Sequence, residues 1–208
     1  MHFYNPRDFA VDSYKKVDDL PYGGGAGMVL KPEPFFTAYD SVPKGPKNRV
    51  LLMTPQGRSL TQSDLNRWSV NYEQLILLCG HYEGFDERIR TLADEEVSIG
   101  DFVLTGGEIP AMTIINGVVR LLPGTVGSVD SLLNESHTDL LLEHPHYTRP
   151  PEYRGLSVPS VLRSGNHGEV ARWRELQRQK RTKDRRPDIY NKWLEENKLM
   201  KNDNDILD

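Results

Sequence analysis

Cysteine is almost absent from this chain of 208 residues, which contains only Cys79. A single cysteine excludes an internal disulfide and any metal site built from several cysteines, and it is typical of a protein from a reducing cytoplasm. No catalytic base lies at an obvious spacing from Cys79. We therefore interpret it as a small core residue and not as a nucleophile.

Long apolar runs are also missing. No run approaches the roughly 18 residues that a membrane-spanning helix needs, and the N-terminus lacks the pattern of a signal peptide. With 37% hydrophobic and 27% charged residues, the composition is that of an ordinary soluble protein. The length allows one sizeable domain and a smaller one. We expect a cytoplasmic protein without a membrane partner.

The glycine-containing loops lack the residues of two common nucleotide-binding motifs. None is followed by the Lys-Ser/Thr pair of a P-loop, and none has the spaced glycines of a dinucleotide fingerprint. The run Gly23-Gly-Gly-Ala-Gly27 is too flexible for the interior of a strand or helix. Its successive amides can form an anion nest, so both an anion-binding loop and a plain flexible loop stay open there.

Three short apolar runs end in turns that contain glycine or proline. The runs are Val50–Met53, Leu75–Cys79 and Asp101–Leu104. The turns that follow them are Thr54–Gly57, Gly80–Gly84 and Thr105–Gly107. Such runs are typical of buried parallel strands, and ligands of open α/β sheets bind beyond the carboxyl ends of the strands. The three turns together therefore predict one pocket.

The intervening segments predict helices and one acidic loop. We expect a short helix around Phe35–Asp40, an amphipathic helix within Ser59–Asn71 and a helix start within Glu83–Leu92. The acidic segment Asp94–Glu96 is typical of a solvated loop. Glu108–Leu122 is apolar nearly all round, which predicts a helix that is buried on several sides, in a core or a dimer interface.

Charge is distributed unevenly along the chain. The net charge is −4, but residues 149–192 contain twelve Lys or Arg and only five acids. Residues 1–148 are correspondingly acidic. A basic module on an acidic body favours a polyanionic partner. The alternative is a solvated helix face whose charges pair locally.

The basic module is predicted to be helical. Ser164-Gly-Asn166 is a helix-start pattern, and an apolar stripe follows from His167 to about Lys180, with Arg178 among the charges on the other faces. A second helix is predicted to begin near Pro187 and to pass through Leu194. The polar tail Asn197–Asp208 is expected to be irregular. The segment 127–148 reads as a linker between two domains.

Several motifs occur together in an order that carries a resemblance. They are Tyr22–Met28, Thr54–Gly57, Cys79–Arg88, Ser98–Glu108, His146–Pro150 and Ser164–His167. Over roughly residues 5–190 the chain resembles the bacterial tRNA (guanine-N1)-methyltransferases of the SPOUT class. The resemblance implies an α/β fold with a parallel sheet and a trefoil knot, plus a small all-α C-terminal domain.

The resemblance also implies a domain organisation. Residues 1–126 would form the knotted cofactor-binding domain, residues 127–148 the linker and residues 149–208 the basic helical tRNA-binding domain. Members of this family usually carry a further strand and helix before the first motif. We therefore expect either that the start codon is assigned late or that a strand of the sheet is missing, which would expose its neighbours.

For activity, the resemblance implies methyl transfer from S-adenosylmethionine to N1 of guanine 37 in tRNA, next to the anticodon. It implies a homodimer with the active site at the subunit interface, with magnesium assisting. No residue of this chain is assigned to a metal. The residues implied to hold the cofactor are Thr54, Pro55, Gly80, Tyr82, Glu83, Ile99, Gly100, Phe102, Leu104, Gly106, Gly107 and Pro110.

Two catalytic residues follow from the resemblance and from the chemistry of guanine. Between the fixed flanks, the catalytic aspartate of the family falls on Glu135, where Glu-Ser-His replaces the usual Asp-Ser-Phe. Methylation requires a base that removes the N1 proton, a role that suits Glu135, and a donor for the charge that develops on O6, a role that suits Arg120. His137 is a rival base.

The basic module supplies the residues that we expect to contact RNA. They are Arg149, His167, Arg185 and Arg186. Because both catalytic residues and the RNA contacts rest on the resemblance, three alternatives stay open. One is a weakly active or inactive RNA-binding homologue, another a SPOUT enzyme that acts on a different tRNA or rRNA nucleotide, and the third a nucleotide-binding enzyme that uses Gly23–Gly27.

Overall fold

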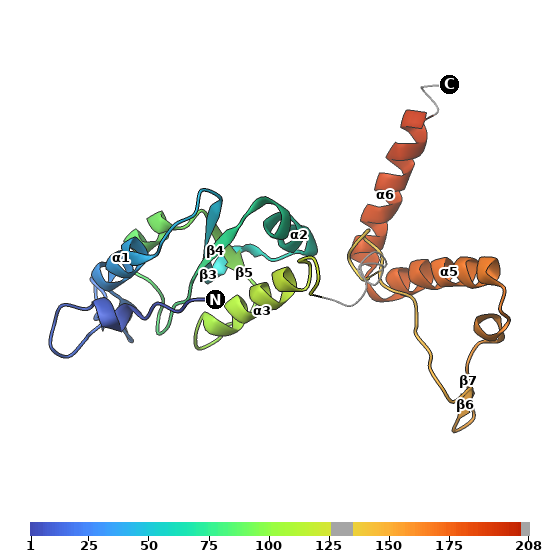
Figure 1. Ribbon diagram of the computed structural model, residues 1–208, viewed down its shortest axis with the longest axis horizontal. Helices are drawn as coiled ribbons and strands as arrows, with labels where there is room; N and C mark the ends of the chain where they lie inside the picture. The colour runs from blue at the N-terminus through green and yellow to red at the C-terminus, as the bar shows by residue number, and fades with distance from the viewer. Residues whose placement is uncertain (126–134, 205–208) are drawn as a thin grey trace. The chain divides into compact units, whose positions relative to one another are not determined.

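The computed structural model describes residues 1–125 and 135–204, with side chains up to Asn197 (Figure 1). The chain divides between Val126 and Gly127 into two compact units. The predicted segment 127–148 falls partly outside the described residues, which resume at Glu135. No helix in the described ranges is long and apolar enough to cross a membrane.

A parallel sheet forms the centre of the first unit. Its strands are β3 (Asn48–Ser59), β4 (Gln74–Leu78) and β5 (Glu95–Ser98), and within the described residues their order is β4–β3–β5. Both neighbours run parallel to β3, and the pairing with β4 is the one that the apolar runs predicted. Because the strands are parallel, their carboxyl ends lie at the same edge of the sheet.

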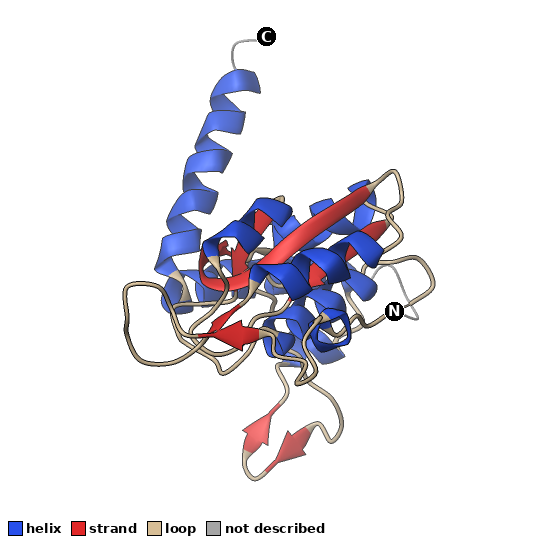
Figure 2. Cartoon of the chain, turned by 90° about the vertical axis from the view of Figure 1, so that its left-hand side faces the viewer, coloured by secondary structure: helices blue, strands red, loops and turns tan. Residues whose placement is uncertain are grey.

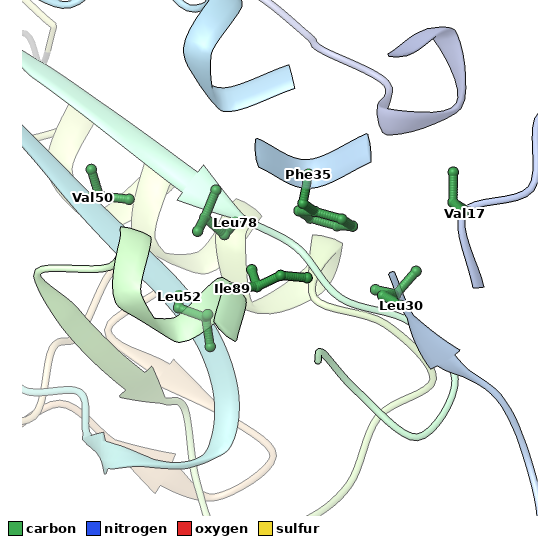
Figure 3. Close-up of a cluster of buried hydrophobic side chains, with 7 residues drawn as sticks. All are labelled: Val17, Leu30, Phe35, Val50, Leu52, Leu78 and Ile89. Atoms are coloured by element: carbon green, nitrogen blue, oxygen red, sulfur yellow. The ribbon is translucent and has the colours of Figure 1, made fainter. Parts of the chain in front are cut away.

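The central strand β3 has one core on each face. Val50 and Leu52 belong to one cluster of buried side chains, whereas Leu51 and Met53 belong to another. Successive side chains of a strand point to opposite faces, so an unbroken apolar run marks a strand that is buried on both sides. In Figure 3, Phe35 from α1 and Ile89 lie against the first of these clusters.

Helices cover both faces of this sheet. Helix α1 (Pro32–Ser41) and the 3-10 helix η2 (Glu87–Leu92) contribute to the cluster around Val50, while α2 (Gln62–Asn71) and α3 (Glu108–Val119) contribute to the cluster around Leu51. Figure 2 shows helices in blue beside the strands in red. The remaining elements of this unit are η1 (Pro6–Phe9), β1 (Asp18–Asp19) and β2 (Val29–Leu30), with β1 and β2 antiparallel.

Local sequence explains where the helices begin. Thr61 accepts a hydrogen bond from the backbone of Asp64, whose side chain accepts one in return from the backbone of Thr61, so the two form a capping box at the start of α2. Pro32 occupies the first turn of α1, where its missing N–H has no cost. The predicted helices around Phe35–Asp40 and within Ser59–Asn71 are confirmed.

The third predicted strand was wrong. Asp101–Leu104 is irregular and largely exposed, and the strand is instead Glu95–Ser98, whose first part was predicted as a solvated acidic loop. Only Val97 of this strand reads as a core residue, and it is fully buried. Hydrophobic periodicity does not identify this acidic strand, because its carboxylates are neutralised by side chains that are distant in sequence.

Those side chains are three arginines around Glu95. Its carboxylate accepts hydrogen bonds from Arg49 at 2.8 Å, from Arg67 at 2.7 Å and from Arg58, and it also accepts one from the indole of Trp68 at 3.2 Å. Burial alone raises the pKa of Glu95, but the hydrogen bonds from these arginines outweigh it and hold the pKa well below its usual range. Glu95 is therefore ionised in the folded protein.

Helix α3 is less completely enclosed than its sequence predicted. Ala111, Ile114 and Val118 are buried, and Gly117 lies so close to Leu65 of α2 that a Cβ there would sit 2.6 Å from a methyl carbon. Ile109, Met112 and Val119 are exposed in the single chain. One face is thus buried within the single chain, and burial of the other face in a dimer stays a prediction.

The second unit contains two long helices, α5 (His167–Arg185) and α6 (Pro187–Asn204). Asn166 caps α5 by accepting a hydrogen bond from the backbone of Glu169 at 3.2 Å, which confirms the start predicted there. Helix α5 continues five residues past the predicted end. Helix α6 runs to Asn204, so the expectation of an irregular tail from Asn197 was wrong for its described part.

A small hairpin precedes these helices. Strand β6 (Glu152–Tyr153) pairs antiparallel with β7 (Leu156–Ser157), and Arg154 and Gly155 between them have positive φ, as the shortest hairpin turns require. The 3-10 helix η3 (Ser160–Arg163) follows. The described part of this unit is therefore not purely helical, and the all-α expectation omitted the hairpin because each strand is only two residues long.

Candidate functional site

A pocket of about 300 Å³ opens at the carboxyl end of the parallel sheet. Thr54–Gln56 within β3 and the loops that follow β4 and β5 line it together. The three glycine-containing turns predicted one pocket here, although the first of them, Thr54–Gly57, lies within β3. All twelve residues expected to hold a cofactor lie on its wall. They are Thr54, Pro55, Gly80, Tyr82, Glu83, Ile99, Gly100, Phe102, Leu104, Gly106, Gly107 and Pro110.

The backbones of these loops approach one another unusually closely. The amide of Gly107 donates to the carbonyl of Gly80 at 2.8 Å, and a Cβ on Gly107 would lie 2.8 Å from Cα of Cys79. A Cβ on Gly57 would lie 2.4 Å from the backbone nitrogen of Val97. Only glycine permits such contacts, which is the structural reason for glycine at these turns.

The wall of the pocket combines exposed apolar side chains with carboxylates. Phe102, Leu104 and Tyr82 all remain accessible to solvent and line the cavity, as do the carboxylates of Glu83 and Glu87. Flat apolar surfaces with a few polar groups are typical of a site for a small organic ligand. Glu87 pairs with Arg90 at 3.0 Å, whereas the carboxylate of Glu83 can complement a positively charged group. The lining therefore fits a nucleoside that carries a sulfonium and an amine.

The glycine-rich run Gly23–Gly27 lies beside this pocket. A Cβ on Gly27 would lie 2.4 Å from Cγ of Glu83, and the amide of Glu83 donates to the carbonyl of Met28 at 3.0 Å. All four glycines in the run have positive φ, the conformation that only glycine adopts freely. The run therefore borders the wall at Glu83.

The predicted site residues do not include His81, which lines the pocket, or Glu108, which contacts it. Nε2 of His81 lies 2.6 Å from Oε1 of Glu108, and a backbone bridge joins His81 to Gly106. This pair connects the loop after β4 to the start of α3. A signal was present, since both residues belong to the quoted motifs, but nothing in their spacing showed that they meet.

Cys79 behaves as the sequence predicted. It packs against the cluster around Leu51. Burial, reinforced by the charge of Glu108, raises the pKa of its thiol to about 11. The thiol is thus protonated at neutral pH and is a poor nucleophile, since the reactive form is the thiolate.

The two predicted catalytic residues belong to different units. Arg120 is half-buried at the end of α3, where its amide donates to the carbonyl of Asn116 at 3.2 Å. Glu135 is half-buried in the second unit, and its carbonyl accepts from the amide of Thr138 at 3.3 Å. His137, the rival base, is exposed in the same turn. The meeting of Arg120 with Glu135 stays a prediction.

The residues expected to contact RNA are all exposed in the second unit. His167 is the first residue of α5, Arg185 is its last, and Arg149 precedes the hairpin. Arg186 follows α5 and forms a two-pronged ion pair with Asp188, at 2.8 and 2.6 Å, which lowers the pKa of Asp188 to about 2. Part of the charge of Arg186 is therefore neutralised locally.

Comparison with known proteins identifies the family of this chain. A model of the family described as tRNA (Guanine-1)-methyltransferase TrmD matches residues 1–192. The chain belongs to this family. The resemblance drawn from the motifs is thereby confirmed, and the α/β fold with a parallel sheet is the fold expected of a TrmD family member.

Three similar proteins carry the name tRNA (guanine-N(1)-)-methyltransferase. A tRNA (guanine-N(1)-)-methyltransferase of Synechococcus sp. (strain CC9311) is 70% identical over 193 residues, which are 93% of this chain and 81% of that protein. The protein of the same name from Synechococcus sp. (strain WH7803) is 72% identical over 190 residues, 91% of this chain and 78% of that protein. One from Crocosphaera subtropica is 60% identical over 198 residues, 95% of this chain and 82% of that protein.

In this TrmD family member, the glycine of the third loop offers a sharp test of the pocket. We expect Gly107→Ala to weaken S-adenosylmethionine binding by roughly 10- to 100-fold, because overpacking against backbone costs about 1–3 kcal/mol. The backbone of Cys79 and Gly80 cannot rotate away from the new methyl group. Titration calorimetry would measure the change.

Gly45→Ala, outside the pocket, is the matched control. A Cβ at Gly45 would make an ordinary contact, 3.8 Å from Oε1 of Gln74. We expect binding within a few-fold of the unchanged protein. Equal losses for both variants would contradict the view that backbone contact at Gly107 shapes the pocket.

Proposed function

We propose that this chain transfers a methyl group from S-adenosylmethionine to N1 of guanine 37 in tRNA. The cofactor pocket would be the cavity at the carboxyl end of β3, β4 and β5. The observation that carries the proposal is the convergence of all twelve resemblance-derived residues on that single cavity. The names of the relatives agree with this reaction.

The methyl donor supplies an electrophilic methyl group on a positively charged sulfur. The chain's own contribution is to bind, to orient and to handle protons. Guanine N1 carries a proton at neutral pH, and Glu135 would accept it as methylation proceeds. Arg120 would stabilise the negative charge that develops on O6, because a guanidinium stays charged and donates to carbonyl oxygens. Alignment of the reacting atoms would supply much of the rate.

We further propose that the three loops form a trefoil knot. The second part of β3 returns to β5, where Arg58 pairs with Val97 after an interruption that follows Met53. Gly57 and Gly107 are the points at which backbones pass each other most closely. Glycine at crossing points is what a tightly threaded chain requires, because a side chain would keep the segments apart.

A homodimer is part of the proposal. The exposed residues Ile109, Met112 and Val119 of α3 form an apolar surface that a second copy would cover. The active site would then combine the pocket of one subunit with the second unit of its partner.

A role for magnesium and a cytoplasmic location also stay proposals. No cluster of three or more metal-ligating side chains occurs within residues 1–125 and 135–197.

One assay tests the reaction. The full chain would be incubated with S-adenosylmethionine labelled in the methyl group and with a tRNA transcript that has guanine at position 37. We expect label in the tRNA and a reverse-transcription stop at position 37, because N1 methylation blocks base pairing. A transcript with adenine at that position is the control. Label in the control, or a stop at another nucleotide, would contradict the proposed target.

The basic helices give a prediction about tRNA affinity. We expect Arg185→Ala combined with Arg186→Ala to weaken tRNA binding and to reduce the slope of log Kd against log salt by about one to two, since each phosphate contact contributes about 0.9. Filter binding between low and moderate salt would measure both. Because Asp188 already pairs with Arg186, the larger share should come from Arg185.

The control is Lys47→Ala, which removes an exposed cation of the first unit that lies 3.8 Å from Glu73. We expect it to leave the salt slope unchanged. An unchanged slope in the double arginine variant would mean that this end of α5 is a solvated surface.

A further inference from the structure

The segment that carries Glu135 is fastened to helix α5 within the second unit. Leu141 is buried, with 1% of its surface exposed. The amide of the next residue, Leu142, donates to Oγ1 of Thr182 at 2.9 Å. Arg178 donates from Nη2 to the carboxylate of Asp139. Two points of the turn, Asp139 and Leu142, are thus held by one helix.

The groups of α5 that hold this turn face inward. Thr182 has no exposed surface, and the side chain of Arg178 is 8% exposed. The hydroxyl of Thr182 also donates to the carbonyl of Arg178 at 2.7 Å, so the two residues form one anchor. A buried guanidinium that pairs with a carboxylate is not available to bind phosphate. Arg178 therefore does not belong to the exposed basic surface, where the sequence had placed it.

The turn itself has a backbone that needs such support. His137 has φ 71° and Leu140 has φ 64°, values that residues with a Cβ seldom adopt. Strained residues of this kind persist where surrounding contacts over-determine them. Here the amide of His137 donates to the carbonyl of Leu141 at 3.0 Å, and the amide of Glu143 donates to Oγ of Ser136 at 3.0 Å.

We propose that Arg178 and Thr182 are positioning residues for methyl transfer, which through Asp139 and Leu142 fix the turn that presents Glu135. The inference rests on the proposed function, in which Glu135 is the base. It gives α5 two roles on two faces. Exposed cations such as Arg172 and Lys180 would meet the tRNA, while the buried face holds the residue that acts on the guanine.

The physical reason is the short range of proton transfer. A base must lie within hydrogen-bond reach of the proton that it removes, and a displacement of about 1 Å can lower a rate by roughly 100-fold. Loosening the anchor would therefore slow the chemical step. It would leave the cofactor pocket in the first unit and the exposed face of α5 unchanged.

The test uses Thr182→Val, which keeps the shape of the side chain and removes its hydroxyl. We expect its single-turnover rate at saturating tRNA and S-adenosylmethionine to fall about tenfold, part of the roughly 100-fold loss that a displacement of about 1 Å can cause. The Kd for tRNA should stay within about twofold. Thr182→Ser restores the hydroxyl and should restore the rate.

Repeating the measurement in the Glu135→Gln variant separates an effect on the position of Glu135 from a general structural defect. In Glu135→Gln there is no carboxylate base to position, so adding Thr182→Val should slow the reaction no further. If Thr182→Val lowers the rate by the same factor in both backgrounds, or if it weakens tRNA binding by that factor, the inference is overturned. A wild-type chain that methylates no tRNA would instead overturn the proposed function.

Asp139→Asn provides an independent variant if Thr182→Val does not fold. The side chain of Asp139 is half exposed, so the substitution leaves a polar acceptor in place and removes only the charge opposite Arg178. We expect a slower single-turnover rate that again depends on Glu135. A rate equal to that of the wild type in both Asp139→Asn and Thr182→Val would overturn the role of the anchor.

Discussion

Glu135→Gln should lower the single-turnover rate of methyl transfer by roughly 10²–10⁴-fold, the usual contribution of a general base. Glutamine keeps the size and the hydrogen-bonding shape of the side chain but cannot accept the N1 proton of guanine. Rapid-quench measurement with labelled S-adenosylmethionine and excess enzyme would give the rate. Affinity for the methyl donor should be unchanged, because its proposed pocket lies entirely in the first unit.

Two variants of neighbouring residues control this result. Glu143→Gln removes another carboxylate of the same segment, one that lies 2.7 Å from His146, and should leave the rate within a few-fold of the wild type. His137→Gln tests the rival base. A large loss in His137→Gln together with near-normal activity in Glu135→Gln would transfer the role to the histidine.

Glu135→Asp addresses the departure from the usual residue of the family. Aspartate is one methylene shorter, so its carboxylate reaches less far from the same backbone. If the turn held by α5 has adapted to glutamate, the shorter side chain should react more slowly. A faster reaction would mean that the turn still has the geometry that suits aspartate.

Glu95→Gln should lower the free energy of unfolding by about 3 kcal/mol, the lower end of the cost of breaking a buried ion pair. The carboxylate is 9% exposed and accepts hydrogen bonds from Arg49, Arg58 and Arg67. Their guanidinium groups remain 28–43% exposed, so water offsets part of the loss. Urea denaturation monitored by tryptophan fluorescence would report it, because Trp68 donates to this carboxylate.

The same network predicts a loss of stability in acid. The folded-state pKa of Glu95 is depressed, and hydrogen bonds from Arg58, Thr61 and Arg67 outweigh burial to lower the pKa of Asp64 to about 2. The unfolded chain therefore binds more protons than the folded chain below about pH 5, so stability falls as the pH decreases from about 5 to about 2. Glu95→Gln should flatten this dependence.

Glu73→Gln is the matched control for both measurements. Glu73 is an exposed carboxylate that lies 3.8 Å from Lys47, and an exposed pair of this kind contributes at most about 1 kcal/mol. We expect little change in the free energy of unfolding and an unaltered acid transition. A loss as large as that of Glu95→Gln would contradict the special role of the arginine network.

The comparison of sequence with structure is most informative at the sheet. Val50–Met53 could be recognised as a doubly buried strand because its apolar run is unbroken. Glu95–Ser98 could not, since its two acids become compatible with a strand only when Arg49, Arg58 and Arg67 surround Glu95 and Arg90 pairs with Glu96. Asp101–Leu104 was wrongly predicted as a buried strand, because its apolar side chains line a pocket and not the core.

The pocket, too, was only partly predictable from the sequence. Glycine at the strand ends predicted that the three loops would meet, and the resemblance supplied the identity of the twelve wall residues. Neither could show that Gly107 passes against the backbone of Cys79 or that His81 reaches Glu108. Such contacts join residues far apart in sequence, and local pattern does not encode which distant segments meet.

The sequence by itself determined the family, the two parallel strands β3 and β4, and the positions of α1, α2 and α5. Periodicity and caps act within a few residues, so they are readable locally. Only the tertiary structure decided which charges are buried. Arg178 and Glu95 look like surface residues in the sequence. Each becomes an internal anchor because partners distant in the chain, Asp139 for one and three arginines for the other, offset the cost of removing a charge from water.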